Sequence, residues 1–195
     1  MNDGSSPESL DSDDMRRLRE GDDLALNELM TRWQQTLVRH IYRFTQNETD
    51  ALDLAQETFV RVYQHRQKYD SRAAFSTWLY TIATNLCRNH TRWKSRHPAI
   101  SLELESVFDS TLGDRLPSSV PTPRQNAATS ELSTAIASAF AELPPDQRTA
   151  AILQNYNALP NSEIAAILGC TVKAVEGKLH RARHFLREKL APWMV

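Results

Sequence analysis

Apolar residues recur at three- and four-residue steps through most of the chain, and this spacing predicts amphipathic helices. We expect a first helix over residues 26–44, a second over 51–63 and a third over 75–90. The polar residues 46–48 and 68–72 interrupt the pattern and mark the turns between these helices. No segment alternates with period two for long, so the sequence predicts an all-α fold class.

The composition changes between His97 and Ser130. These residues hold four of the nine prolines and nine serines or threonines. Such a segment buries too little apolar surface to offset the entropy lost on ordering. We therefore predict two small helical domains joined by a flexible linker over residues 97–130.

Helical spacing resumes over residues 132–143 and stops at Pro144-Pro145. Proline has no amide hydrogen to donate and restricts the residue before it, so a helix is expected to end there. Asp146 is then expected to cap a further helix that runs to about Tyr156.

Residues 161–190 predict a helix-turn-helix. A short helix over 163–168, capped by Asn161 or Ser162, is closed by Gly169, and Thr171 is expected to cap a final helix. A short helix, a glycine-containing turn and a second helix are typical of this DNA-binding motif. The buried stripe of the final helix is expected to consist of Val172, Val175, Leu179, Ala182, Leu186 and Leu190.

The outward face of the final helix is the first candidate nucleic-acid surface. It carries Lys173, Glu176, Gly177, His180 and Arg181, with Arg183 beside it. Lysine and arginine bind phosphates or guanine edges, and glutamate can accept from cytosine. The alternative is a plain helical hairpin with a solvated basic face. His180 and His184 are four residues apart and could share a metal ion, but no third ligand lies nearby in sequence.

The third helix offers a second candidate surface. At ~100° per residue, one side carries the apolar residues, and the other carries Trp78, Asn85, Arg88, Asn89 and Arg92. Asparagine reads base edges, arginine neutralises phosphates, and tryptophan can stack on an unpaired base. The alternative is an ordinary surface helix with Trp78 half-buried at its rim.

Charge is distributed unevenly although the net charge is only −1. Residues 71–102 carry five basic residues and no acid, and residues 171–190 carry six basic residues and two acids. Residues 1–12 are expected to form an acidic, disordered tail without the features of a signal peptide. Local charge decides where a polyanion docks, so both basic segments remain candidates for nucleic-acid binding.

Cys87 and Cys170 are 83 positions apart, which excludes a disulfide framework and a cysteine-based zinc cluster and suits a reducing cytoplasm. No run of ~18 apolar residues could span a membrane, so no membrane insertion is expected.

Three stretches, in this order, resemble the extracytoplasmic-function (ECF) group of bacterial RNA polymerase sigma factors. They are Asp50–Tyr63 (DALDLAQETFVRVY), Phe75–Asn85 (FSTWLYTIATN) and, in the last block, Leu143-Pro144-Pro145, Glu163-Ile164-Ala165 and Leu179–Arg183 (LHRAR). The resemblance covers Met15 to Leu190. It implies that residues 13–96 are sigma region 2 and that residues 131–195 are sigma region 4.

The resemblance also implies partners and roles. The clamp of the largest subunit of core RNA polymerase would be bound by Asp50, Asp53, Gln56 and Glu57. Region 4 would bind the flap of the polymerase. The melted −10 strand would be bound by Trp78, Asn85, Arg88, Asn89 and Arg92. A base flipped out of that strand would be held at the loop of residues 70–74. The −35 element, which lies one and a half duplex turns from the −10 element, would be read by Lys173, Glu176, Gly177, His180, Arg181 and Arg183. Glu176-Gly177 departs from the family pattern, so the −35 sequence read here can differ from that of relatives.

The resemblance further implies a cytoplasmic initiation factor that is not an enzyme, needs no cofactor or metal, and is held inactive by an anti-sigma factor. Two rivals remain at this point. One is a stand-alone DNA-binding regulator that uses only the helix-turn-helix. The other is a hydrolase built on the scattered histidines and acids, although the six histidines show no ligand or triad spacing.

Overall fold

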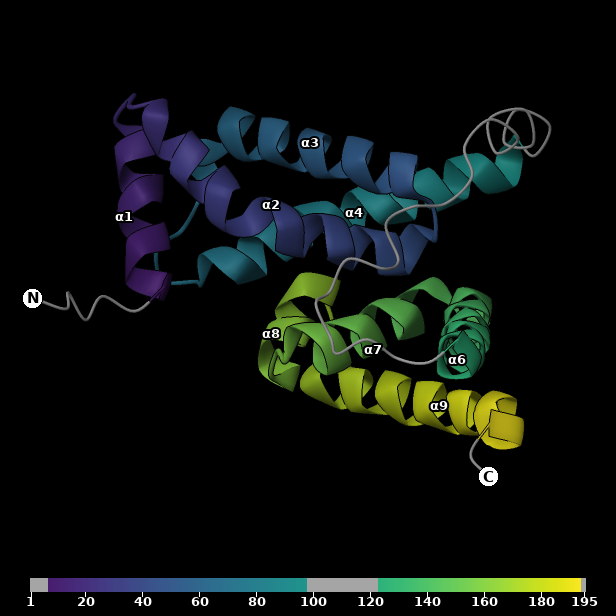
Figure 1. Cartoon of the computed structure of the whole chain (residues 1–195). Helices are drawn as coiled ribbons and strands as arrows, with labels where there is room; N and C mark the ends of the chain where they lie inside the picture. Colours follow the sequence, from purple (N-terminus) through teal and green to yellow (C-terminus); the bar gives the residue numbers. More distant parts are fainter. Residues whose placement is uncertain (1–6, 98–122, 194–195) are drawn as a thin grey trace, which may run out of the picture.

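The computed structural model describes residues 7–97 and 123–193, and within these ranges all regular structure is helical (Figure 1). The all-α prediction is therefore confirmed. The N-terminal domain contains α1 (Pro7–Arg19), α2 (Leu24–Thr45), α3 (Glu48–Gln64), the 3-10 helix η1 (Arg66–Lys68) and α4 (Phe75–Arg96). The C-terminal domain contains α6 (Pro123–Glu142), α7 (Pro145–Asn157), α8 (Asn161–Leu168), α9 (Val172–Leu190) and the 3-10 helix η2 (Ala191–Trp193).

Helices α2, α3 and α4 pack around one apolar core. Each contributes a stripe spaced at three and four residues, as the sequence predicts. The fully buried members include Leu29, Leu37, Ile41, Ala51, Val62, Leu79 and Ala83. The turn between α2 and α3 uses Gln46 in the left-handed conformation, and the side chain of Asn47 then caps α3 by accepting from the Asp50 amide at 2.9 Å.

Helix α1 begins inside the segment that the sequence predicts as a disordered tail. Two of its carboxylates are buried and paired: Asp11 accepts from Arg32 Nε at 2.9 Å and from Trp33 Nε1 at 3.0 Å, and Asp14 also binds Arg32. Asp11 is 2% exposed and Asp14 is 7% exposed. These partners lie on α2, about twenty residues away in sequence. The acidic composition of residues 1–12 therefore predicted a disordered tail wrongly for residues 7–12, because the partners of Asp11 are not local.

The C-terminal domain differs from the prediction at three helix starts. Helix α6 begins at Pro123, inside the predicted linker, and proline costs nothing at a first helical position because its missing amide has no partner there. Residues 98–122, the rest of that predicted linker, lie outside the described residues. Helix α7 is preceded by Pro144, so Asp146 is a first-turn residue and not the cap. Helix α8 is preceded by Pro160, one residue before the expected caps.

The helix-turn-helix itself forms as predicted. Gly169 closes α8 in the left-handed conformation (φ 63°), and the Thr171 hydroxyl accepts from the Ala174 amide at 3.2 Å to cap α9. Val175, Leu179 and Ala182 are buried, and Leu186 and Leu190 are half-buried. The prediction for Val172 is wrong, because this side chain is 42% exposed at the first position of α9, ahead of the turn that packs on α8.

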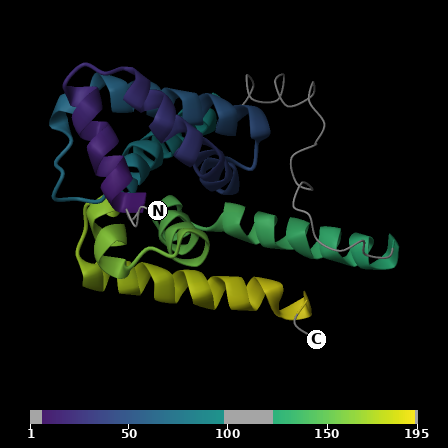
Figure 2. The same cartoon turned by 60° about the vertical axis from the view of Figure 1, so that its left-hand side comes forward.

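The two domains lie against each other, with α4 on α8 and α2 on α7 (Figures 1 and 2). Tyr80 of α4 is 2% exposed and packs among the core residues of the C-terminal domain. Its hydroxyl accepts from Asn157 Nδ2 at 2.6 Å, and Asn157 Oδ1 is 3.0 Å from His40 Nδ1. Because the amide nitrogen of Asn157 donates to Tyr80, the Asn157 oxygen faces His40 and accepts a hydrogen bond from His40 Nδ1.

Further polar contacts surround this centre. Thr77 Oγ1 donates to Glu163 Oε2 at 2.6 Å, and Arg148 Nη1 donates to the carbonyl of Phe44 at 3.0 Å. The Arg43 guanidinium lies 4.1 Å from the centre of the Tyr156 ring. The contact between the domains is therefore directional as well as apolar.

In the described part of the chain, we find no helix with the length and apolar character needed to cross a bilayer.

The Thr171 cap can be tested by substitution. Thr171→Ala leaves a first-turn amide of α9 without its partner, so we expect the free energy of unfolding to fall by about 1 kcal/mol. Thr171→Ser keeps the oxygen and is the matched control, expected to stay near wild type. Urea denaturation followed by circular dichroism measures both, and equal stabilities for the two variants would contradict the cap.

His40 predicts a pH dependence of stability. Burial lowers the pKa of His40 to about 4, and the nearby Arg43 charge acts in the same direction. The unfolded chain therefore binds this proton more readily than the folded one. Stability from this group is complete above pH ~6.5 and falls by about 1.4 kcal/mol per pH unit between ~6.5 and ~4.

Denaturation curves at pH 7, 6 and 5 measure this dependence. In His40→Gln, which keeps a side-chain donor but cannot titrate, the slope between pH 7 and 5 should flatten. An unchanged slope would assign the pH dependence to other groups.

Candidate nucleic-acid interface

The polar face of α4 is divided between solvent and the C-terminal domain. Asn85, Asn89 and Arg92 are exposed, as a nucleic-acid surface requires. Trp78 is half-buried, and Arg88 binds Asp146 of α7. The five predicted residues therefore lie on one side of α4. Three of them are exposed to solvent, and the other two contact neighbouring side chains.

Trp78 belongs to an aromatic cluster and is not a free stacking platform. Its ring lies 5.3 Å from Tyr69 and 6.3 Å from Phe75, measured between ring centres. Tyr69 is 5% exposed, its hydroxyl donates to the carbonyl of Ala73 at 3.0 Å, and burial raises its pKa.

Tyr69 thereby shapes residues 70–74, the loop before α4. This role was not predicted from the sequence, although a single aromatic residue inside a polar turn was a usable signal.

The face of α9 is open. Lys173, Glu176, His180, Arg181 and Arg183 are all exposed, on the side away from the buried stripe. A Cβ added at Gly177 would meet only the Arg181 guanidinium, at 3.5 and 3.9 Å, which is ordinary van der Waals contact. Nothing inside the described protein therefore requires glycine at this position.

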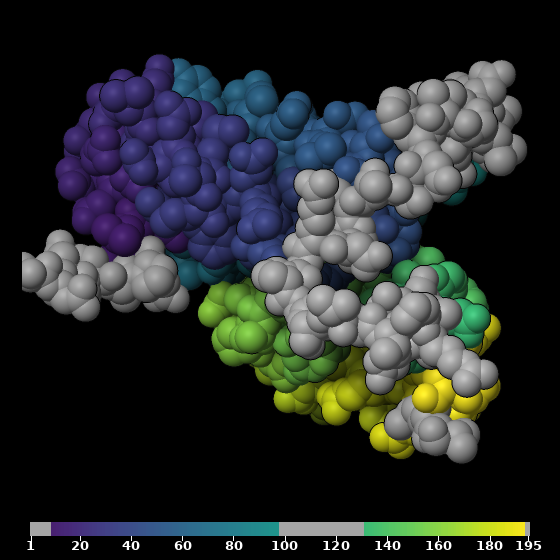
Figure 3. All heavy atoms as spheres, in the orientation of Figure 1, coloured from purple at the N-terminus to yellow at the C-terminus, as the bar shows by residue number. Residues whose placement is uncertain are grey.

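A basic groove joins the two faces. It has a volume of about 520 Å³ and lies between α4, the start of α7, and α9. Arg88 and Arg92 line it from α4, and Lys178 and Arg181 line it from α9. Two predicted −10 residues, Arg88 and Arg92, and one predicted −35 residue, Arg181, therefore line the same groove. Figure 3 shows the two domains side by side.

Asp146 stands at the centre of this groove. It accepts from Arg88 Nη2 at 2.6 Å and forms an ion pair with Lys178 Nζ at 3.1 Å. Burial alone would raise the pKa of Asp146, but the two cations more than offset it, and the pKa lies below its ordinary value. The carboxylate is ionised and links α4 to α9.

The four residues predicted for polymerase binding fall into two groups on α3. Asp53 and Gln56 are exposed, and Glu57 is half-buried and pairs with Arg61 at 2.8 Å. Asp50 instead binds His90 at 3.0 Å and Lys94 at 2.8 Å, with its side chain 19% exposed. Asp50 therefore ties α3 to α4.

Val60 joins the exposed face of α3 without having been predicted from the sequence. It is 47% exposed and shares the face of Asp53 and Gln56 at ~100° per residue. Val60 therefore adds an apolar side chain to the exposed face of α3 that carries Asp53 and Gln56.

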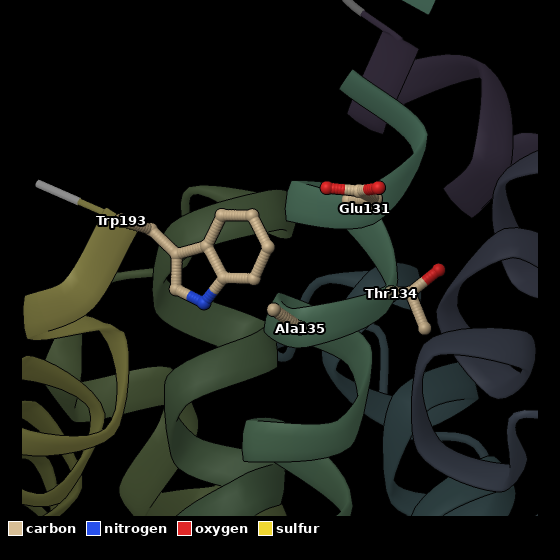
Figure 4. A pocket seen from close by; sticks show the side chains of 4 residues that line it. All are labelled: Glu131, Thr134, Ala135 and Trp193. Carbon is tan, nitrogen blue, oxygen red and sulfur yellow. The ribbon is translucent and has the colours of Figure 1, made fainter. Parts of the chain in front are cut away.

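Other features of the described residues bear on catalytic and metal chemistry. A pocket of about 380 Å³ between α6 and η2 is lined by Glu131, Thr134, Ala135 and Trp193, with the indole opposite Ala135 (Figure 4). No three histidine, cysteine, aspartate or glutamate side chains converge as metal ligands within the described ranges. Burial raises the pKa of Cys87 to about 12, so it remains a thiol.

Comparisons with known proteins agree with this geometry. A family model of sigma-70 region 2 matches residues 29–97, and one of sigma-70 region 4 matches residues 133–186. The ECF RNA polymerase sigma-E factor of Haemophilus influenzae is 30% identical over 181 residues, which cover 92% of this chain and 95% of that protein.

Two solved structures share the architecture. CnrH, in complex with the cytosolic domain of CnrY, has 27% identity and a TM-score of 0.67, covering 94% of this chain and 98% of that chain. The sigma factor RpoE of Bartonella quintana, in complex with the anti-sigma factor NepR, has 21% identity and a TM-score of 0.63, covering 85% and 96%. The second likeness is one of fold. With both sigma regions matched and a 30% identical relative aligned along nearly its whole length, the chain belongs to the extracytoplasmic-function group of RNA polymerase sigma factors.

Proposed function

We propose that this sigma factor binds core RNA polymerase through α3 and presents two separate DNA faces, on α4 and α9, to one promoter. The observation that carries the proposal is the exposure of amides and a cation on α4 and of cations on α9, within a chain that belongs to this family. Acting on promoters, it works in the cytoplasm as an initiation factor and not as an enzyme.

The α4 face takes the unpaired −10 strand. Asn85 and Asn89 lie one turn apart and can hydrogen-bond to successive base edges, and Arg92 can neutralise a phosphate. Trp78 acts as a wall beside residues 70–74 because its ring is held by Tyr69 and Phe75. A base that leaves the stack would rest against this preformed aromatic edge.

The α9 face takes the −35 duplex in the major groove. Lys173 lies in the first turn, where a recognition helix contacts bases, and His180 and Arg181 lie two turns later. Glu176 prefers a cytosine amino group and repels phosphate. Arg183 is placed at the edge of the face, where it meets the DNA backbone.

The polymerase surface is the exposed part of α3. Asp53, Gln56 and Val60 form a mixed acidic and apolar face, with Glu57 beside it. Asp50 supports this face from behind by holding α3 to α4 through His90 and Lys94, and we assign it no direct contact.

The chain is long enough to occupy both promoter elements at once. Sites one and a half duplex turns apart are separated by ~50 Å, at ~34 Å per turn. Residues 98–122, fully extended, reach about 80 Å. A chain tether alone favours shorter separations, so core polymerase is needed to hold the domains apart.

An anti-sigma factor is the expected regulatory partner. RpoE of Bartonella quintana, which shares the fold, is bound by one in its solved structure.

The polymerase interface can be tested with Asp53→Ala in the full chain. We expect affinity for purified core polymerase to fall by roughly tenfold, because the residue is exposed at the centre of the proposed contact. Run-off transcription from promoters selected with the wild-type holoenzyme should fall in parallel. Glu28→Ala removes an exposed acid from α2 and is the matched control.

The absence of any promoter-specific product with wild-type protein would refute the proposed function itself.

Gly177→Ala separates helix stability from DNA contact. Alanine should raise the free energy of unfolding by about 1 kcal/mol, since no internal contact opposes the added methyl group. If a DNA strand passes close to this point, holoenzyme affinity for −35 duplex should fall by about tenfold. Binding to single-stranded −10 DNA, measured by fluorescence anisotropy, should stay unchanged. Unchanged −35 affinity in the more stable variant would remove Gly177 from the interface.

A further inference from the structure

The groove between α4, the start of α7 and α9 carries more positive charge than its own acid neutralises. Four basic side chains line it from two helices: Arg88, Arg92, Lys178 and Arg181. Asp146 is the one acid in this described lining, and its carboxylate is shared by Arg88 Nη2 at 2.6 Å and Lys178 Nζ at 3.1 Å. The other two cations, Arg92 and Arg181, therefore have no acid of the groove to bind.

Arg92 and Arg181 are available for an anion. Both are exposed, and neither forms an ion pair within residues 7–97 and 123–193. The guanidinium of Arg181 lies back along α9, where its nitrogens would be 3.5 and 3.9 Å from a Cβ added at Gly177. A guanidinium binds phosphoryl oxygens through two parallel N–H donors. Two such groups, on two helices that line one groove, can therefore bind the same anion together.

The start of α7 adds to the same electrostatic field. Its first turn forms a third wall of the groove, with Pro144, Pro145, Asp146 and Gln147. No side chain caps this end of the 13-residue helix, so the backbone amides of Asp146 and Gln147 have no partner from a cap. The N-terminal end of a helix carries a partial positive charge and favours anions. This end alone would not define a site, but it lines the same groove as the four cations.

The size of the groove indicates the class of anion. Its volume is about 520 Å³, which lies in the range of pockets that bind small molecules. One phosphate group is short for contacts with both helices, whereas a diphosphate carries oxygens on two phosphorus atoms and can bind cations of α4 and α9 together. Pro144 and Pro145 add apolar surface beside these cations. The groove therefore fits a small molecule with two linked phosphoryl groups.

We propose that, in the free sigma factor, this groove binds the diphosphate group of a small molecule, with Arg92 and Arg181 as its main contacts. The diphosphate comes either from a nucleotide or from inorganic pyrophosphate. RNA synthesis consumes nucleoside triphosphates and releases pyrophosphate, so both sources are present where a sigma factor acts. The proposal goes beyond the proposed function and does not rest on it, because the chain itself forms the groove.

The test titrates the full-length protein with inorganic pyrophosphate, without polymerase or DNA, by isothermal titration calorimetry. The wild type is expected to bind one pyrophosphate per chain with a Kd of about 100 μM. Arg92→Gln and Arg181→Gln should each weaken this binding by about tenfold, since each removes one charge-assisted contact. Arg96→Gln and Arg187→Gln are the matched controls, because they remove exposed arginines of the same two helices that do not line the groove.

Two further ligands test the bridging and identify the source of the diphosphate. Orthophosphate should bind the wild type about tenfold more weakly than pyrophosphate, because it contacts only one of the two arginines at a time. GTP and ATP are then compared with pyrophosphate. Tighter binding of either nucleotide would identify a nucleotide as the ligand, with its base on the apolar surface of Pro144 and Pro145. Binding no tighter than that of pyrophosphate would identify pyrophosphate itself.

Three results would overturn the proposal. They are no binding of pyrophosphate to the wild type, equal losses in the groove variants and their matched controls, and equal affinities for orthophosphate and pyrophosphate. The last two results would assign the binding to diffuse charge attraction. Run-off transcription by the wild-type holoenzyme remains a separate measurement. Its failure alongside normal pyrophosphate binding would refute the proposed function and leave the diphosphate site in place.

Discussion

The burial of Tyr80 sets the arrangement of the whole chain. Its ring packs against Trp33 and His40 of its own domain and in the core of the other domain, where an unpaired hydroxyl would carry a desolvation penalty. Asn157 removes that penalty by donating to the hydroxyl, and His40 satisfies the remaining oxygen of the amide. Three helices, α2, α4 and α7, are thereby fixed relative to one another by one hydrogen-bonded chain.

The consequences for DNA binding follow from the side of α4 on which Tyr80 lies. Thr77, Tyr80 and Arg88 share the flank that meets the C-terminal domain, and Asn85 and Asn89 lie on the next flank, which stays open. The packing of the two domains therefore leaves the amides of Asn85 and Asn89 accessible and engages the Arg88 guanidinium.

Much of the candidate site could be predicted from the sequence, because it depends on local rules. Helical spacing predicted that Asn85, Asn89 and Arg92 share one face of α4. The Thr171 cap and the Gly169 turn predicted where α9 begins, and therefore which of its residues face outward. The predictions were wrong where contacts with residues far away in sequence determine the structure. Asp146 was expected to cap α7, yet Pro144 precedes the helix and two cations from other helices hold the carboxylate. Residues 7–12 were expected to be a tail, yet Arg32 and Trp33 bury Asp11.

The sequence by itself determined the helices from α2 to α4 and from α7 to α9, the basic faces and the family resemblance, because periodicity, capping and local charge act between residues a few positions apart. The tertiary structure alone decided which polar groups are free to act. Arg88 and Arg92 are alike in sequence terms, but one pairs with a carboxylate 58 residues away and the other is exposed. Such pairings arise only when remote helices pack, and no pattern along the chain records them.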